Sequence, residues 1–105
     1  MRKFLVVLGL LGGCALFTGE KVKVKPGAYV LDVRSPGEFA EGHLKGAVNI
    51  PVDELEATLP SMPPDRNREI AVYCRNGSCS ARARGVLLKA GYARVEDLGG
   101  LSNLK

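Results

Sequence analysis

The chain has 105 residues, enough for one domain once any targeting segment is set aside. Its formal charge is +4, from 15 basic and 11 acidic residues, and only 6% of its residues are aromatic, with no tryptophan. This charge is too mild, and the aromatic residues are too few, for a nucleic-acid-binding surface, so we expect no nucleic-acid partner.

Residues 1–13 have the pattern of a signal peptide. A basic start is followed by an apolar run from Phe4 to Leu11, which is far too short to span a bilayer. Two glycines then precede Cys14, an arrangement that resembles a bacterial lipobox. Cleavage there would make Cys14 the lipidated first residue, held at a membrane by its acyl chains. An ordinary signal peptide cut nearby is the alternative, and both predict export to the periplasm or cell envelope.

The remaining chain is predicted to be a tether over residues 14–25 and a single domain over residues 26–105. Without the two basic residues of the leader, 13 basic residues remain against 11 acidic ones, a formal charge of +2. The domain contains two cysteines, Cys74 and Cys79. A disulfide between them would close a short loop and constrain little of the unfolded chain. A chemical role therefore explains the two cysteines better than a structural disulfide does.

Short strands alternate with helices along the predicted domain. Apolar runs of strand-forming residues predict strands over residues 28–33, 47–50, 69–73 and 94–98. Helices are predicted after the capping residues Ser35, Asp53 and Ser80, and they end at Gly42, Pro60 and Gly91. This alternation implies an open parallel α/β sheet.

Cys74 lies at the carboxyl end of the strand over residues 69–73, before a tight loop and a helix, where open α/β sheets place their active sites. Backbone N–H groups of the loop and of the helix start can converge on its sulfur and stabilise the nucleophilic thiolate. The outer sulfur of a persulfide is also an anion, so the same donors would stabilise that intermediate. Gly77 allows the backbone to curl around the sulfur.

Four segments carry a resemblance to the rhodanese family. DVRSPGEF at 32–39 and EGHLKGAVNIP at 41–51 resemble the amino-terminal signature of rhodanese domains. YCRNGSCS at 73–80 resembles their active-site loop, and VEDLGGL at 95–101 resembles their closing Gly-Gly segment. The resemblance covers nearly all of residues 28–101 and implies a rhodanese-like open parallel sheet flanked by helices, with a thiosulfate sulfurtransferase activity.

The resemblance also implies roles for individual residues. Cys74 is the expected catalytic nucleophile, and the expected substrate-binding residues are Arg75, Asn76, Gly77, Ser78, Cys79, Ser80 and Arg82. Asp32 and Arg34 either line the rim of the pocket or form an internal ion pair. His43, the only histidine, is expected to be structural, and no metal site is expected.

Cys79 is a departure, because many family members have an arginine at this position. As a thiol it could attack a persulfide on Cys74 and leave a disulfide between Cys74 and Cys79. The alternative is that Cys79 only packs where the helix begins. The sequence leaves both readings open.

The reaction expected from these residues is a two-step sulfur transfer without a cofactor. Cys74 would take a sulfane sulfur from thiosulfate or a similar donor and pass it to cyanide or a thiol. One alternative is a noncatalytic sulfur carrier that serves a sulfur-relay protein, or a thiol-disulfide redox module using both cysteines. A phosphatase or arsenate reductase of the Cys-loop type is disfavoured, since it needs an arginine where Ser80 stands.

Overall fold

The computed structural model describes residues 24–103. The expected signal peptide, Cys14 and all but the last two residues of the expected tether lie outside this range. Within it, no helix combines the length and the apolar character needed to cross a membrane. Pro26 and Gly27 form the turn that leads into the domain.

Four strands form one parallel sheet, which confirms the predicted architecture. In the order of the sheet they are β2 (Val48–Asn49), β1 (Tyr29–Asp32), β3 (Ile70–Cys74) and β4 (Val95–Gly100). Every residue of the inner strand β3 is buried, as expected of a strand covered on both faces. A register shift between Val72 and Tyr73 interrupts the pairing of β3 with β4 and brings Cys74 opposite Gly100.

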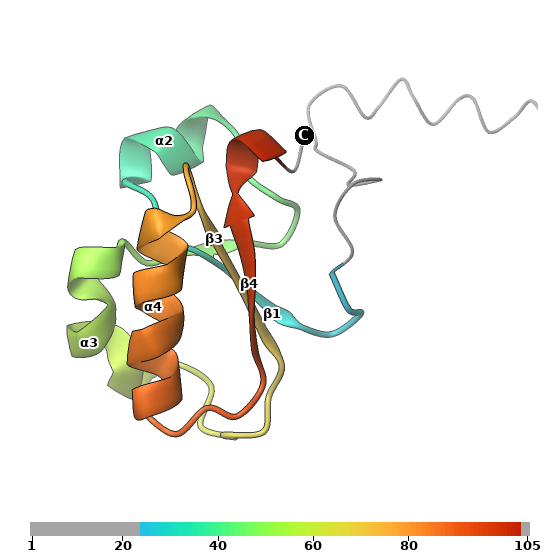
Figure 1. Cartoon of the computed structure of the whole chain (residues 1–105), viewed down its shortest axis with the longest axis vertical. Coiled ribbons are helices and arrows are strands. Elements are labelled where there is room, and N and C mark those ends of the chain that lie inside the picture. The colour runs from blue at the N-terminus through green and yellow to red at the C-terminus, as the bar shows by residue number, and fades with distance from the viewer. Residues whose placement is uncertain (1–23, 104–105) are drawn as a thin grey trace, which may run out of the picture.

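Helices flank the sheet, and most of them are short. They are α2 (Pro36–Glu41), α3 (Leu55–Thr58) and α4 (Ser78–Lys89), with 3-10 turns η1 (Val52–Glu54), η2 (Leu59–Ser61) and η3 (Leu101–Asn103). Helices α3 and α4 lie side by side on one face of the sheet, and the carboxyl ends of the strands point toward α2 (Figure 1).

The core has a part on each face of the sheet. The larger part, beneath α3 and α4, is built on Leu31, Leu55, Val72 and Leu87. The smaller part, on the other face, consists of Val30, Leu44, Tyr73 and Leu101. Because side chains alternate along a strand, Val72 and Cys74 share the helical face while Tyr73 points to the opposite one. Cys74 therefore lies next to the start of α4.

Ser35 caps α2 as predicted. Its side chain accepts a hydrogen bond from the Glu38 N–H, and the Glu38 carboxylate accepts one from the Ser35 N–H, which completes a capping box. The prediction that Asp53 caps the next helix is wrong. Asp53 lies inside the 3-10 turn η1, and its side chain makes no capping hydrogen bond to that turn or to α3.

The start of α4 also differs from the prediction. The helix begins at Ser78, three residues before the expected start, and its N-cap is Gly77 rather than Ser80. Gly77 has a φ of +95°, a left-handed conformation that turns the chain into the helix early. Ser80 lies in the first helical turn, where its hydroxyl donates a hydrogen bond to the Gly77 carbonyl at 3.0 Å.

Candidate active site

Two backbone N–H groups converge on the sulfur of Cys74. The Gly77 N–H and the Ser80 N–H each donate to Cys74 Sγ at 3.1 Å. Cys74 is the last residue of β3, and only 1% of it is exposed. Two N–H donors aimed at one sulfur stabilise negative charge at this point, whether on Sγ itself or on a second sulfur bound to it. This geometry is the one expected from the sequence.

The closing Gly-Gly segment packs against the first residues of the active-site loop. A Cβ on Gly100 would lie 2.6 Å from the Arg75 carbonyl oxygen and 2.9 Å from the Asn76 Cα. No real side chain fits at such distances, so the first residues of the loop pack directly against the backbone of β4. Gly100 therefore fixes the position of the loop that carries the two N–H donors.

A cavity of about 210 Å³ opens beside the Cys74 sulfur. The residues that line the cavity lie after β1, in α2, around η1 and in the active-site loop. They are Val33, Arg34, Ser35, Glu38, Pro51, Val52, Asp53, Cys74, Arg75 and Cys79. The cavity thus brings together four of the residues expected from the sequence, Arg34, Cys74, Arg75 and Cys79.

The other expected substrate-binding residues do not line this cavity. Gly77 and Ser80 act on the sulfur through their backbone N–H groups. Asn76 accepts hydrogen bonds from the N–H and the hydroxyl of Ser78, so these two residues shape the exposed side of the loop. Arg82 forms an ion pair with Asp53 at 3.2 Å. Asp53 lines the cavity, whereas Arg82 does not.

Charges at the rim are paired. Arg75, whose side chain is 75% exposed, lies 3.0 Å from the Glu38 carboxylate. The N–H of Ser35, followed by the Ser35 hydroxyl and the charge of Arg75, lowers the pKa of Glu38 below its ordinary value. Glu38 is a site residue that the sequence identified only as part of a helix cap, because its partner is 37 positions away.

Comparison with known proteins assigns the family. The model of the rhodanese-like domain family matches residues 18–105. The chain belongs to the rhodanese-like domain family. It is 33% identical over 103 residues to the thiosulfate sulfurtransferase PspE of Escherichia coli (strain K12), a match that covers 98% of this chain and 91% of that protein.

Solved structures of rhodanese-like proteins agree with this assignment. A rhodanese with anions from E. coli superposes with a TM-score of 0.68 and 37% identity, covering 72% of this chain and 89% of that one. A human single-domain sulfurtransferase, TSTD1, gives a TM-score of 0.64 and 27% identity, covering 90% of this chain and 84% of that one. The chain is therefore a member of a rhodanese-like sulfurtransferase family, with the single-domain fold expected from its sequence.

Asp32 and Arg34 form an internal ion pair in this rhodanese-like domain. Arg34 donates two hydrogen bonds to Asp32 Oδ2, at 3.1 and 2.7 Å, and a third to the Gly42 carbonyl at 2.6 Å. Asp32 is fully buried and serves the structure, whereas Arg34 also lines the cavity. Of the two readings of this pair, the ion pair is confirmed.

Tyr73 extends this buried network to the opposite face of the sheet. Its hydroxyl donates to Asp32 Oδ2 at 2.7 Å and accepts the Leu44 N–H at 3.0 Å. Burial, followed by the hydrogen bond to Asp32, raises the pKa of Tyr73 above its ordinary value. The network ties the end of β1 and the end of β3 to the loop that follows α2, and so holds one wall of the site.

His43 lies outside the cavity. Its Nδ1 is 2.8 Å from the Phe39 carbonyl oxygen, and its ring stacks on Phe39 at 3.7 Å between centroids. These contacts give it the structural role expected from the sequence. Residues 24–103 contain no group of three or more histidines, cysteines and carboxylates close enough to hold a metal ion.

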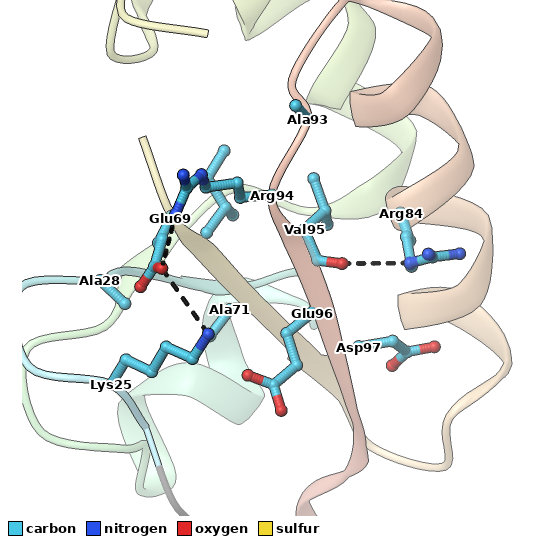
Figure 2. A pocket seen from close by; sticks show the side chains of 11 residues that line it. Lys25, Ala28, Glu69, Ala71, Arg84, Ala93, Arg94, Val95, Glu96 and Asp97 are labelled. Carbon is cyan, nitrogen blue, oxygen red and sulfur yellow. Dashed lines mark hydrogen bonds and ion pairs between the residues drawn. The ribbon is translucent and has the colours of Figure 1, made fainter. Parts of the chain in front are cut away.

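A larger cavity of about 570 Å³ lies at the other end of β3 and β4 (Figure 2). Glu69 pairs there with Lys25 at 3.6 Å and with Arg94 at 3.3 Å. Arg84 donates to the Val95 carbonyl at 3.1 Å, so it points away from the Cys74 loop. The described lining of this cavity includes no cysteine, serine or histidine. Cys74 and the two N–H donors on its sulfur lie at the smaller cavity instead.

Proposed function

We propose that this chain is a sulfurtransferase that moves a sulfane sulfur from thiosulfate or a similar donor to cyanide or a thiol, through a persulfide on Cys74. The observation that carries the proposal is the pair of N–H groups, from Gly77 and Ser80, that donate to the Cys74 sulfur at 3.1 Å. The thiosulfate sulfurtransferase PspE, to which the chain is similar along almost its whole length, supports the choice of donor.

The first step is attack of the Cys74 thiolate on the outer sulfur of the donor. With thiosulfate, a bond forms between Cys74 Sγ and the sulfane sulfur, the bond to the sulfonate sulfur breaks, and sulfite leaves with its electron pair. The transferred sulfur, bonded about 2 Å from Sγ, enters the adjoining cavity. The second step is attack of the acceptor on that outer sulfur, which returns Cys74 as a thiolate and yields thiocyanate when cyanide is the acceptor.

Arg75 is the residue that would meet an anionic donor at the rim. It lines the cavity and is mostly exposed, but it is also paired with Glu38 at 3.0 Å. To bind Arg75, a dianion such as thiosulfate must either share the guanidinium with the Glu38 carboxylate or displace that carboxylate. Arg34, the other lining arginine, is already held by Asp32. Donor affinity is therefore expected to depend on how easily Arg75 leaves Glu38.

The same arrangement disfavours phosphoryl chemistry. The loop has a buried serine, Ser80, at the position where a Cys-loop phosphatase needs an arginine, and both arginines of the cavity lining are paired with carboxylates. Small anionic sulfur donors suit a cavity of about 210 Å³ better than phosphate esters do.

The test is turnover of thiosulfate and cyanide by the purified full chain, measured as thiocyanate formed. Cys74→Ser should reduce turnover to the level of the reaction without protein, because the nucleophile is gone. Glu69→Gln, at the larger cavity, is the matched control and should keep full activity. Retained turnover in Cys74→Ser would overturn the proposal. Sulfur loading without turnover would point instead to a carrier that delivers sulfur to one relay protein.

We also propose that the domain is exported and held at a membrane by lipid on Cys14. The family match begins at residue 18, so Cys14 and the apolar segment before it precede the matched domain. Labelling of expressing cells with radioactive palmitate should mark the wild-type protein and should not mark Cys14→Ser. An unlabelled wild-type protein would reject the lipid anchor, and a protein found in the cytoplasmic fraction would reject export.

A further inference from the structure

The two cysteines of the domain open onto one small cavity. Cys74 and Cys79 both line the 210 Å³ space, and both pack on the apolar cluster beneath α3 and α4. Cys74 is buried, whereas Cys79, the second residue of α4, is partly exposed. A sulfur carried by Cys74 therefore enters a space that already has a second thiol in its wall.

Chain geometry limits how far apart these cysteines are. The Ser80 N–H lies 3.1 Å from Cys74 Sγ, and Cys79 precedes Ser80 directly. Standard bond lengths then place the Cys79 Cα no more than about 5.5 Å from the Cys74 sulfur. A disulfide further requires that the two Cα atoms lie about 4.4–6.8 Å apart. We therefore expect rotation of the Cys79 side chain and movement of the loop before the two sulfurs bond.

The surroundings of Cys79 favour reaction over packing alone. Its sulfur has no hydrogen-bond partner within residues 24–103, so no bond must break before it moves. It lies in the first turn of α4 and lines the cavity that would hold the outer sulfur of a Cys74 persulfide.

We propose that Cys79 resolves the Cys74 persulfide and releases its outer sulfur as hydrosulfide. The step rests on the proposed function, since it begins from the persulfide. The Cys79 thiolate attacks Cys74 Sγ, a bond forms between the two cysteine sulfurs, and the bond from Cys74 to the outer sulfur breaks. The outer sulfur leaves with the electron pair as hydrosulfide and takes the proton of the Cys79 thiol. The sulfane sulfur is reduced and the two cysteines are oxidised to a disulfide, so no other reactant is needed.

This step gives the chain a second outcome beside transfer to an acceptor. When acceptor is scarce, one sulfur is released and the loop closes as a Cys74–Cys79 disulfide, which removes the nucleophile. A small thiol reductant reopens the loop by thiol-disulfide exchange. The donor is then converted to sulfite and hydrosulfide at the expense of that thiol.

The test is a single turnover of the reduced full chain with excess thiosulfate, without oxygen, added thiol or cyanide. Sulfite and hydrosulfide are measured, and the protein is then alkylated and digested with trypsin. Cleavage after Arg68, Arg75 and Arg82 places the cysteines in separate peptides, residues 69–75 and 76–82. The disulfide is therefore read as one mass that joins these two peptides, whatever the state of Cys14.

We expect wild type to release one sulfite and one hydrosulfide per chain and to yield the joined peptides. Cys79→Ser should release one sulfite and no hydrosulfide and keep one extra sulfur on residues 69–75. A wild-type sample without thiosulfate, handled in parallel, should show neither hydrosulfide nor joined peptides.

Two results would overturn this inference while the proposed function stands. One is release of sulfite with a stable persulfide left on Cys74 of the wild type. The other is an extra sulfur on residues 76–82, which would mean that Cys79 attacks the outer sulfur instead of Cys74 Sγ. Absence of sulfite from both wild type and Cys79→Ser would overturn the proposed function and the inference together.

Discussion

Two cavities of this domain lie at opposite ends of the same strands and differ in the side chains that line them. The larger one, at the amino ends of β3 and β4, has Glu69 in its wall, and the carboxylate of Glu69 pairs with both Lys25 and Arg94 (Figure 2). The smaller one, at the carboxyl end of β3, has a buried cysteine with two N–H donors on its sulfur. The N–H donors around the Cys74 sulfur favour the smaller cavity as the reactive site, although its volume is the smaller of the two.

The largest effect after loss of Cys74 is expected from Gly100→Ala. A Cβ at this position meets the Arg75 carbonyl at 2.6 Å, so the loop must move away from β4. A displacement near 1 Å at a reacting centre costs on the order of 10–100-fold in rate, and the overpacking costs about 1–3 kcal/mol of stability. Thiocyanate formation and urea unfolding measure the two effects.

Gly85→Ala is the matched control for this substitution. Gly85 lies in α4, and a Cβ there meets no atom within 4 Å. The change should leave activity intact and stabilise the helix by about 0.5–1 kcal/mol. Equal activity in the Gly100 and Gly85 variants would show that close packing of the loop on β4 does not position the donors.

A moderate loss of stability is expected from Tyr73→Phe. The change removes the partner of the buried Leu44 N–H and one hydrogen bond to Asp32, which together cost about 1–3 kcal/mol. Tyr92→Phe is the control, because the Tyr92 hydroxyl bonds only partly buried groups and should cost less. Urea unfolding at neutral pH compares the two, and a larger loss in Tyr92→Phe would contradict the importance of the Tyr73 network.

Alkaline pH tests the same network in the wild-type protein. Burial and the hydrogen bond to Asp32 raise the pKa of Tyr73 above its unfolded value of about 10. The stability from this group is therefore fully present below pH 10 and is lost as the pH rises toward the folded value. The free energy of unfolding of wild type should fall more steeply above pH 10 than that of Tyr73→Phe. Equal slopes of the free energy of unfolding against pH in the two proteins would exclude Tyr73 as the titrating group.

The smallest effect is expected from Glu38→Gln, which frees Arg75 while keeping a side chain that can complete the capping box. Exposed ion pairs contribute about 0.2–1 kcal/mol, so the KM for thiosulfate should fall by at most about fivefold with little change in kcat. Glu69→Gln at the other cavity should leave KM unchanged. A KM that rises in Glu38→Gln would show that the carboxylate assists the donor rather than competing with it.

Local patterns in the sequence predicted the parts of the fold that depend on neighbouring residues. The capping box at Ser35 and Glu38, the buried strand before Cys74 and the parallel sheet are all confirmed. Each depends on hydrophobic runs or on spacings of a few residues, which the chain reveals without tertiary contacts. The position of Cys74 at the carboxyl end of a parallel strand followed from the same patterns.

Long-range contacts and backbone conformation could not be predicted in this way. The pairing of Arg75 with Glu38 and the contact of Gly100 with the loop join residues that are distant in the chain. Ser80 was predicted to cap α4 because serine favours caps, but the left-handed Gly77 starts the helix three residues earlier. That early start is what brings the Ser80 N–H to the sulfur.

The proposed transfer of sulfur to Cys74 is tested most directly by the mass of its tryptic peptide, residues 69–75, after the full chain reacts with thiosulfate. In the Cys79→Ser background, where the persulfide cannot be resolved internally, we predict one added sulfur on this peptide. The added sulfur should be absent when Cys74 is also replaced by serine and should disappear when cyanide is added. An unmodified Cys74 peptide in the Cys79→Ser protein, with thiosulfate in excess, would show that Cys74 does not carry the sulfur.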